Sequence, residues 1–452
     1  MSKWGVEMAA AMPDARRVLR RVQVGNALAA FGAGFTVPFI YVYATTVRHL
    51  SPGVGGSLFS IWAVAALLVL PFVGRVVDRR GPQAVLVASC VLAAVGSVGF
   101  GLSSGPVPIM LFAALFGAGV AAEQPVLATM VARCSGPADR SKAFAFQFFL
   151  NNLGLGIGGL LGGLIVDPSR PGSFQELFMI EAAMILVLAA VAGTVRLPAV
   201  ASLTVASSAG TTAPTATAAT AATAATAGEG YRALLRDRAM TGVCVLALVL
   251  YFSCYGQFES GLAAFATTVT RVAPGTLGLA LAANTAVIVL GQLLVLRVTG
   301  RRRRSAVIAV VGVIWLAAWG LAGLSALLGP GTGAATAAIL GTYMMFGAGE
   351  MLLSPVLGPL VADLAPAHRL GQYNAAFAGV RQIAMVAGPA FAGLMVGLGA
   401  YTAYLALLGA CTLGVTVLAL RLRHRLTDVQ DGLVAVETPA RLLEREDAVA
   451  AA

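Results

Sequence analysis

Five ionisable side chains lie within or close to long apolar stretches of this 452-residue chain, where charge is otherwise rare. A charge at the centre of a bilayer costs about 2.5–3.5 kcal/mol on insertion scales, so such a residue usually faces a cavity and has a function. A carboxylate there can bind and release protons, and a carboxylate beside an arginine can form an ion pair. These five residues are Glu123, Glu181, Glu259, Glu350 and Arg381.

Glu123 is followed by Gln124 and Pro125 near the middle of its apolar stretch, and no cation is evident at its depth. Burial disfavours the charged form of an unpaired carboxylate, so such a group can exchange a proton near neutral pH. We expect Glu123 to couple protons to the movement of another solute or to bind that solute. The alternative is a carboxylate whose hydrogen bonds are satisfied within a helix bundle.

Glu350 and Arg381 lie on successive apolar stretches at depths that would let them meet. We expect them to form a gating pair or to line a substrate cavity, and the alternative is a static pair, because a buried ion pair does not by itself indicate function. Glu181 and Glu259 are nearer to the ends of their stretches, where charged side chains commonly reach the membrane interface.

Several amides share the apolar stretches with these charges. They are expected to line the same cavity, although hydrogen bonds between helices are the default role of such amides in membranes. The cavity candidates are Asn26, Asn151, Asn152 and Gln257, together with Glu259.

Motifs for nucleotide, metal or hydrolytic chemistry are not evident. Neither lysine lies in a phosphate-binding glycine-rich loop, and His49, His368 and His424 are far apart. We therefore expect no cofactor, no metal and no enzymatic activity, and a process driven by an ion gradient.

The composition identifies the elements that must hold these residues. Hydrophobic residues make up 58% of the chain and charged residues 11%, whereas a soluble domain has about 25% charged residues. This excludes soluble proteins and predicts an all-α membrane protein with twelve transmembrane helices, each of about 20 residues. The predicted spans are 22–46, 54–74, 83–102, 107–131, 143–166, 177–196, 239–266, 276–296, 305–327, 334–362, 372–397 and 400–420.

The basic residues are distributed unevenly between the two sides of these spans. With the N-terminus inside, 26 of the 30 Lys and Arg residues fall on one side and three on the other. The positive-inside rule places the rich side, with both termini, in the cytoplasm. The net charge of +11 is thus a matter of topology and does not indicate nucleic-acid binding. Arg297 and Arg301–Arg304 are expected to contact anionic lipids.

An internal repeat divides the chain into two halves. Residues 116–132 read FGAGVAAEQPVLATMVA and residues 346–362 read FGAGEMLLSPVLGPLVA, at an offset of 230. A duplicated six-helix unit explains this match. Repeats of this kind are one architecture of membrane transporters, whose binding site lies between the two halves. We predict an N-terminal bundle (1–197), an Ala/Thr-rich cytoplasmic linker (198–238), a C-terminal bundle (239–421) and a cytoplasmic tail (422–452).

The loop after the second span carries a recognisable motif. It contains Gly74, Asp78, Arg79 and Gly81, and it resembles the G-x-x-x-D-R-x-G-R-K signature of the major facilitator superfamily. The resemblance implies the major facilitator fold over nearly the whole chain. It also implies that Asp78 docks near the start of the eleventh span and locks the outward-facing state.

The fifth span is similar to the antiporter signature of the same family, G-x-x-x-G-P-x-x-G-G. Glycines at this spacing let helices approach closely, and glycine replaces the expected proline at position 159. The expected helix-packing residues are Gly154, Gly158, Gly162 and Gly163, with Gly388 and Pro389 in the eleventh span.

Together these features predict a proton-coupled exporter of amphiphilic or drug-like compounds or of a secondary metabolite. The resemblance is to the drug:proton antiporter branch, and few hydrogen-bonding groups in the spans favour a hydrophobic substrate. The alternatives are an importer of a small solute with the same fold and a polytopic membrane enzyme or lipid-handling protein. The expected partners are a small-molecule substrate, protons and membrane lipids, and the expected state is a monomer in the plasma membrane.

Overall fold

The computed structural model describes residues 3–40, 43–136, 139–167, 170–197, 234–258, 260–299 and 302–433. Across these residues the secondary structure is helical. Within the described residues, ten helices are long and apolar enough to cross a membrane, and Thr276–Gln292 forms a shorter apolar helix. The predicted all-α membrane architecture is therefore confirmed.

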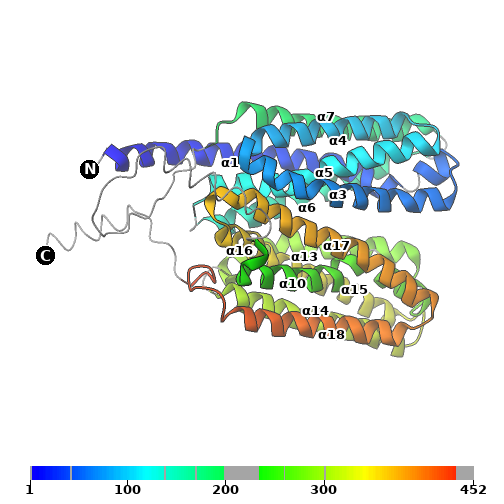
Figure 1. Cartoon of the computed structure of the whole chain (residues 1–452). Coiled ribbons are helices and arrows are strands. Elements are labelled where there is room, and N and C mark those ends of the chain that lie inside the picture. The colour runs from blue at the N-terminus through cyan, green and yellow to red at the C-terminus, as the bar shows by residue number, and fades with distance from the viewer. Residues whose placement is uncertain are drawn as a thin grey trace.

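Two bundles of helices lie beside each other (Figure 1). The N-terminal bundle comprises α1 (Lys3–Thr36), η1 (Val37–Phe39), η2 (Tyr43–Val47), α3 (Pro52–Arg80), α4 (Pro82–Leu102), α5 (Pro106–Cys134), α6 (Arg140–Ile165) and α7 (Pro171–Thr194). The C-terminal bundle comprises α10 (Arg238–Ser253), α11 (Tyr255–Phe258), α12 (Gly261–Thr268), α13 (Pro274–Thr299), α14 (Arg304–Leu327), α15 (Gly333–Leu353), α16 (Leu357–Leu364), η3 (Ala367–Arg369), α17 (Leu370–Gly397) and α18 (Tyr401–Leu422).

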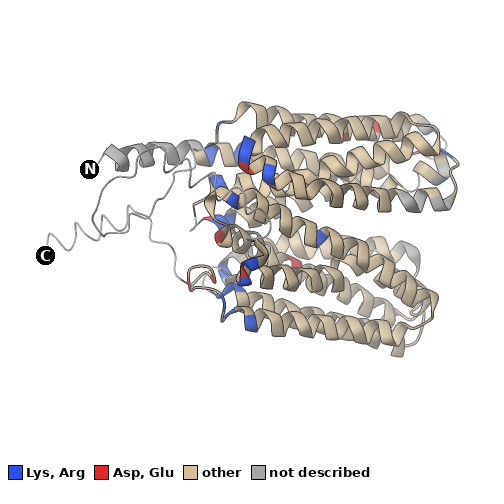
Figure 2. Cartoon of the chain, in the orientation of Figure 1, with Lys and Arg blue, Asp and Glu red and all other residues tan. Residues whose placement is uncertain are grey.

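Helix α17 joins the two bundles at one end and leaves the N-terminal bundle toward the other end (Figure 1). Its principal neighbour across the boundary is α3, and α5 also contacts it. Most Lys and Arg residues lie at the end where α17 begins (Figure 2), and we call this the arginine-rich end.

Three predicted spans are not single uninterrupted helices. The span predicted at 334–362 divides into α15 and α16 around Pro355, and the span predicted at 22–46 loses regular helix after Thr36, close to Pro38. Proline removes a backbone donor and disfavours the helical conformation of the preceding residue. The span predicted at 239–266 divides into α10, α11 and α12.

Glycines bring the first and fifth spans into close contact. A Cβ on Gly154 would lie 2.6 Å from the Ala27 carbonyl oxygen, and one on Gly158 would collide with the Phe31 carbonyl oxygen. Gly162 faces the same helix, whereas the nearest atom to a Cβ on Gly163 is 3.9 Å away. Three of the four expected glycines therefore pack α6 against α1 in this structure.

The corresponding contact in the second half joins α11 to α17. A Cβ on Gly388 would lie 2.6 Å from the Gly256 Cα, so the backbones of the two helices touch there. The neighbouring Pro389 is exposed. The eleventh span therefore packs against the seventh through Gly388, as the fifth packs against the first.

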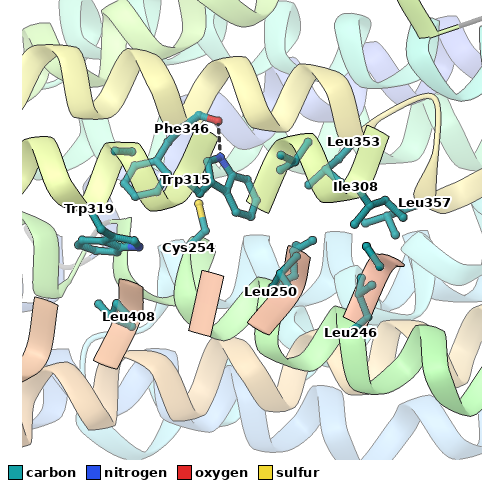
Figure 3. Packing of buried hydrophobic residues seen from close by; sticks show 14 of the residues in the cluster. Leu246, Leu250, Cys254, Ile308, Trp315, Trp319, Phe346, Leu353, Leu357 and Leu408 are labelled. Carbon is teal, nitrogen blue, oxygen red and sulfur yellow. Dashed lines mark hydrogen bonds between the residues drawn. The ribbon is translucent and has the colours of Figure 1, made fainter. Parts of the chain in front are cut away.

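The core of the C-terminal bundle is built around two tryptophans (Figure 3). Trp315 and Trp319 are 0% and 2% exposed. Trp315 Nε1 donates to the Phe346 carbonyl oxygen at 3.2 Å, and Trp319 Nε1 donates to the Ser253 carbonyl oxygen at 3.0 Å. Because both indole N–H groups have acceptors, the rings are buried without the cost of an unpaired donor.

Candidate functional site

The two bundles meet at the arginine-rich end through the carboxylate of Asp78. Asp78 Oδ1 accepts from the Gly371 N–H at 2.7 Å, and Oδ2 accepts from the Gln372 N–H at 3.0 Å. The partners are the first amides of α17, where the helix dipole favours negative charge. Asp78 thus lies at the start of the eleventh span.

The other residues of this motif shape the turn that presents Asp78. A Cβ on Gly74 would lie 2.8 Å from the Gln372 Cα, so glycine allows α3 to approach α17. Gly81 ends α3 with a φ of +85°, which favours glycine. The side chain of Arg79 is exposed.

A second contact between the bundles involves two arginines and one carboxylate. Arg140 of α6 pairs with Asp363 Oδ1 of α16, and Arg304 of α14 pairs with Asp363 Oδ2 at 2.7 Å. The three side chains are between 9% and 15% exposed. Nearby, Asn374 Nδ2 donates to Thr129 Oγ1 at 3.2 Å across the same boundary. These bonds, together with those of Asp78, connect the bundles at the arginine-rich end.

Glu123 lies inside the N-terminal bundle. Its side chain is 6% exposed and is hydrogen-bonded to Cys90 of α4. Within the described part of the chain, Oε1 has no hydrogen-bond partner. An orphaned, buried carboxylate oxygen is costly when the group is charged, so these surroundings stabilise a negative charge on Glu123 poorly.

Glu181 is a second buried carboxylate. Its position near the end of a span favours the membrane interface as much as a site, whereas the structure shows it 1% exposed. Ser97 Oγ donates to Glu181 Oε2 at 2.6 Å, and Oε1 has no partner among the described residues. Helices α1 and α4 pack against α7 and bury Glu181. The position of a residue along its own span does not predict burial of this kind.

A small cavity within the N-terminal bundle reaches Glu181. Glu181 and Ser97 are its polar side chains, and the remaining lining is aliphatic or aromatic. The aromatic wall includes Trp62, Phe100 and Phe178.

Glu350 and Arg381 lie around a pair of tyrosines in the C-terminal bundle. Glu350 is 9% exposed, and the Arg381 guanidinium carbon lies 5.9 Å from the centroid of the Tyr251 ring. Glu350 and Arg381 are both close enough to interact electrostatically with the hydroxyl groups of Tyr251 and Tyr255. The ring centroids of these two tyrosines are 4.9 Å apart. The structure therefore brings the predicted Glu350 and Arg381 into one neighbourhood.

Most of the predicted amides make hydrogen bonds within a single bundle. Asn26 of α1 donates to Asn151 of α6, and Asn152 Nδ2 donates to the Phe148 carbonyl oxygen at 2.9 Å. Gln257 is 0% exposed. Its Nε2 donates to the Gly388 carbonyl oxygen at 3.2 Å, and its Oε1 accepts from the Tyr404 hydroxyl at 3.0 Å. Glu259 lies outside the described residues, as do the linker residues 198–233 and the tail from 434.

Metal binding finds no support in the described residues, which contain no group of three or more His, Cys, Asp or Glu placed to hold an ion. A sequence model of the family described as Major Facilitator Superfamily matches residues 23–344. The match covers the N-terminal bundle, the segment between the bundles and the C-terminal bundle as far as α15.

Curated relatives are named for drug resistance. Multidrug resistance protein 2 of Bacillus subtilis is 30% identical over 147 residues, which are 32% of this chain and 36% of the relative. Multidrug resistance protein MdtG of Escherichia fergusonii is 25% identical over 176 residues, 38% of this chain and 42% of the relative. The matches thus span well under half the length of these relatives.

Solved structures of the same fold cover nearly the whole chain. A bacterial homologue of the iron transporter ferroportin, in an outward-facing state, has a TM-score of 0.72 at 13% identity, and the match covers 90% of this chain and 99% of the homologue. The proton:xylose symporter XylE has a TM-score of 0.65 at 15% identity, and the match covers 91% of this chain and 94% of XylE. At these identities the likeness concerns the fold alone.

Proposed function

This chain belongs to the major facilitator superfamily and is a multi-pass membrane transporter rather than an enzyme, and we propose that it is a proton-coupled exporter. Its substrates are small amphiphilic or drug-like compounds or a secondary metabolite, moved by alternating access. The arginine-rich end faces the cytoplasm by the positive-inside rule, and the membrane is the plasma membrane.

The observation that carries proton coupling is the buried Glu123 carboxylate. Its Oε1 has no hydrogen-bond partner among the described residues and its neighbour Cys90 is 0% exposed. Charge on this carboxylate is costly in such surroundings, and a proton removes that cost. A change in its hydration during alternating access would therefore change its proton affinity, which is the requirement for coupling.

Two observations support export of amphiphilic compounds: the names of the curated relatives and the hydrogen bonding of the buried amides. Relatives named multidrug resistance proteins match part of the chain. The amides Asn26, Asn151 and Gln257 bond within the bundles, so they are engaged rather than available to a polyhydroxylated solute. A hydrophobic compound needs few polar partners, and the aromatic surroundings of Arg381 suit one.

The contacts at the arginine-rich end support a resting state that is closed to the cytoplasm. Asp78, Asp363 and Arg140 join the bundles there, while α17 leaves the N-terminal bundle toward the opposite end (Figure 1). Opening toward the cytoplasm would require these bonds to break. Glu350 and Arg381 lie beyond them and act in gating or in substrate contact.

Replacing Glu123 by Gln tests the proposal. In liposomes containing a pH-sensitive dye, with an imposed proton gradient and a panel of cationic dyes and antibiotics, we expect the wild type to show compound-dependent proton flux. Glu123→Gln removes the proton-binding group but keeps its shape, so we expect this flux to disappear while expression is unchanged. Unchanged flux in Glu123→Gln would disprove the assignment.

The matched control is Glu176→Gln, which changes an exposed carboxylate on α7 and should leave the flux intact. An uptake assay with candidate nutrients in the same liposomes separates export from import. Accumulation of a nutrient driven by protons moving in the same direction would show an importer with the same fold.

A further inference from the structure

Glu123 of α5 and Glu181 of α7 both form hydrogen bonds with the same helix, α4. The partner of Glu123 is Cys90, and the partner of Glu181 is Ser97, both on α4. These two residues are seven positions apart, which is two helical turns or about 10 Å along the axis. The two carboxylates therefore lie at different depths, with Glu181 nearer to the end opposite the arginine-rich end.

The environment of Glu181 contains little that would stabilise a permanent charge. The buried titratable groups around it are Glu123 on α5, Cys90 on α4 and Tyr43 in η2, and Arg48 follows η2. The described charged residues of α1 (Arg16, Arg17, Arg20 and Arg21) and Glu176 of α7 are exposed. Arg48 Nε donates to Tyr43 Oη at 2.7 Å, and its Nη2 donates to the Gly101 carbonyl oxygen at 3.0 Å, so it is engaged at the end of the bundle. Ser97 supplies one donor to Oε2, and Thr36 of α1 also forms a hydrogen bond with the Glu181 carboxyl group.

The free oxygen of Glu181 belongs to a residue that lines the cavity. Glu181 is 1% exposed, and Oε1 has no partner in the described part of the chain. The cavity has room for a water molecule, whose polar neighbours among the described lining residues are Glu181, Ser97 and the indole N–H of Trp62. Such a water would deliver a proton to Oε1.

We propose that Glu181 is a second proton-binding residue, which receives protons from the end opposite the arginine-rich end and passes them to Glu123. The inference rests on the proposed function, because it supplies the route by which Glu123 is protonated. Glu181 gains one proton and becomes neutral. It then releases that proton to a water molecule, which carries it to the Glu123 carboxylate, and Glu181 is charged again. The proton route thus runs inside the N-terminal bundle, separate from the space between the bundles.

Infrared spectroscopy of the reconstituted protein tests this assignment without a substrate. Protonated buried carboxyl groups absorb separately from ionised ones, so the spectrum is followed as the pH is raised. We expect the wild type to show one more titrating buried carboxyl group than Glu181→Gln, because the other buried carboxyl groups, such as Glu123, Glu350 and Asp431, contribute to both spectra. An unchanged number of titrating groups in Glu181→Gln would overturn the proposal.

Proton flux tests the relay itself, with ethidium as the probe. We expect Glu181→Gln to slow ethidium-dependent proton flux about a hundredfold, as loss of a proton-transfer group does, and Glu176→Gln on the same helix to behave as the wild type. Wild-type flux in Glu181→Gln with lost flux in Glu123→Gln would overturn the relay and leave the proposed function standing. Retained flux in both variants, or no flux in the wild type, would remove the proposed function, and the infrared titration would still decide whether Glu181 binds a proton.

Ser97→Ala provides a second variant if Glu181→Gln does not fold. Removing the hydroxyl withdraws the donor that favours the charged carboxylate, so the Glu181 band should titrate at higher pH. Folding is checked by size-exclusion chromatography. An infrared titration of Ser97→Ala identical to that of the wild type would contradict the proposal.

Discussion

A single carboxylate at the arginine-rich end holds the first amides of a helix that belongs to the other bundle. Asp78 accepts from Gly371 and Gln372 at 2.7 and 3.0 Å. Its bonds exist only while α3 and α17 are together, so their free energy enters directly into the equilibrium between open and closed conformations. A residue of this kind acts through its contacts with protein and needs no contact with the substrate.

We predict that Asp78→Asn shifts the protein toward conformations open at the arginine-rich end. The amide keeps an acceptor but loses the charge that the α17 amides and helix dipole stabilise, a loss of about 1–2 kcal/mol. This corresponds to a factor of about 5–30 in the ratio of conformations. Distances between spin labels at the exposed positions 80 and 423, with the native cysteines replaced, measure the shift.

The control for this change is Asp139→Asn. Asp139 is a 49% exposed carboxylate near the same end, and its ion pairs with Arg16 and Lys142 remain within the N-terminal bundle. Its loss should leave the distance distribution as in the wild type. A distribution in Asp78→Asn that matches the wild type would show that this carboxylate does not bias the equilibrium.

The sequence alone identifies some residues of the candidate site but not all of them. Glu123, Glu350 and Arg381 stand out in the sequence because charge is rare in apolar spans, and that signal needs no structure. Glu181 carries the same signal, but its place near a span end favoured the interface equally. Its burial depends on how α1 and α4 pack against α7, and hydropathy along one helix contains no information on the packing of its neighbours.

At the scale of elements, small residues determine how closely helices approach. Gly158 lies where α6 meets the backbone of α1, so we predict that Gly158→Ala destabilises the protein by about 1–3 kcal/mol through overpacking. Gly163→Ala on the same helix should be close to neutral, since the nearest atom to its added Cβ lies 3.9 Å away. Thermal unfolding in detergent compares the two variants, and equal midpoints would contradict this assignment of the α1–α6 contact.

The spans themselves were predictable from apolar length, whereas their irregularities were not. Helix α1 begins at Lys3, well before the predicted start at 22, because a helix that continues beyond the membrane needs no apolar residues. The division of the seventh span into α10, α11 and α12 occurs where Gly256 touches Gly388 of α17. Such a break arises from contact between helices, and a single-span pattern does not reveal it.

At the scale of the whole molecule, Asp363 is bound from both bundles. Arg140 reaches it from the N-terminal bundle, and Arg304 reaches it at 2.7 Å from within the C-terminal bundle. Arg304 also donates to the Gln430 carbonyl oxygen at 2.9 Å, and Asp431 accepts from the Ser305 N–H at 2.8 Å. The segment after α18 thus holds the C-terminal side of this ion-pair cluster in place.

The two arginines should therefore differ in what their loss changes. Arg140→Gln removes a bond that exists only in the closed conformation, so we expect the arginine-rich end to open, with a change of about 1–3 kcal/mol in the equilibrium. Arg304→Gln removes bonds within one bundle, so we expect lower thermal stability with little change in that equilibrium. The spin-label distances between positions 80 and 423 and the unfolding midpoints measure the two effects separately. If both variants opened the arginine-rich end equally, the cluster would act as one structural unit, and Arg140 would have no separate role in closing the transporter.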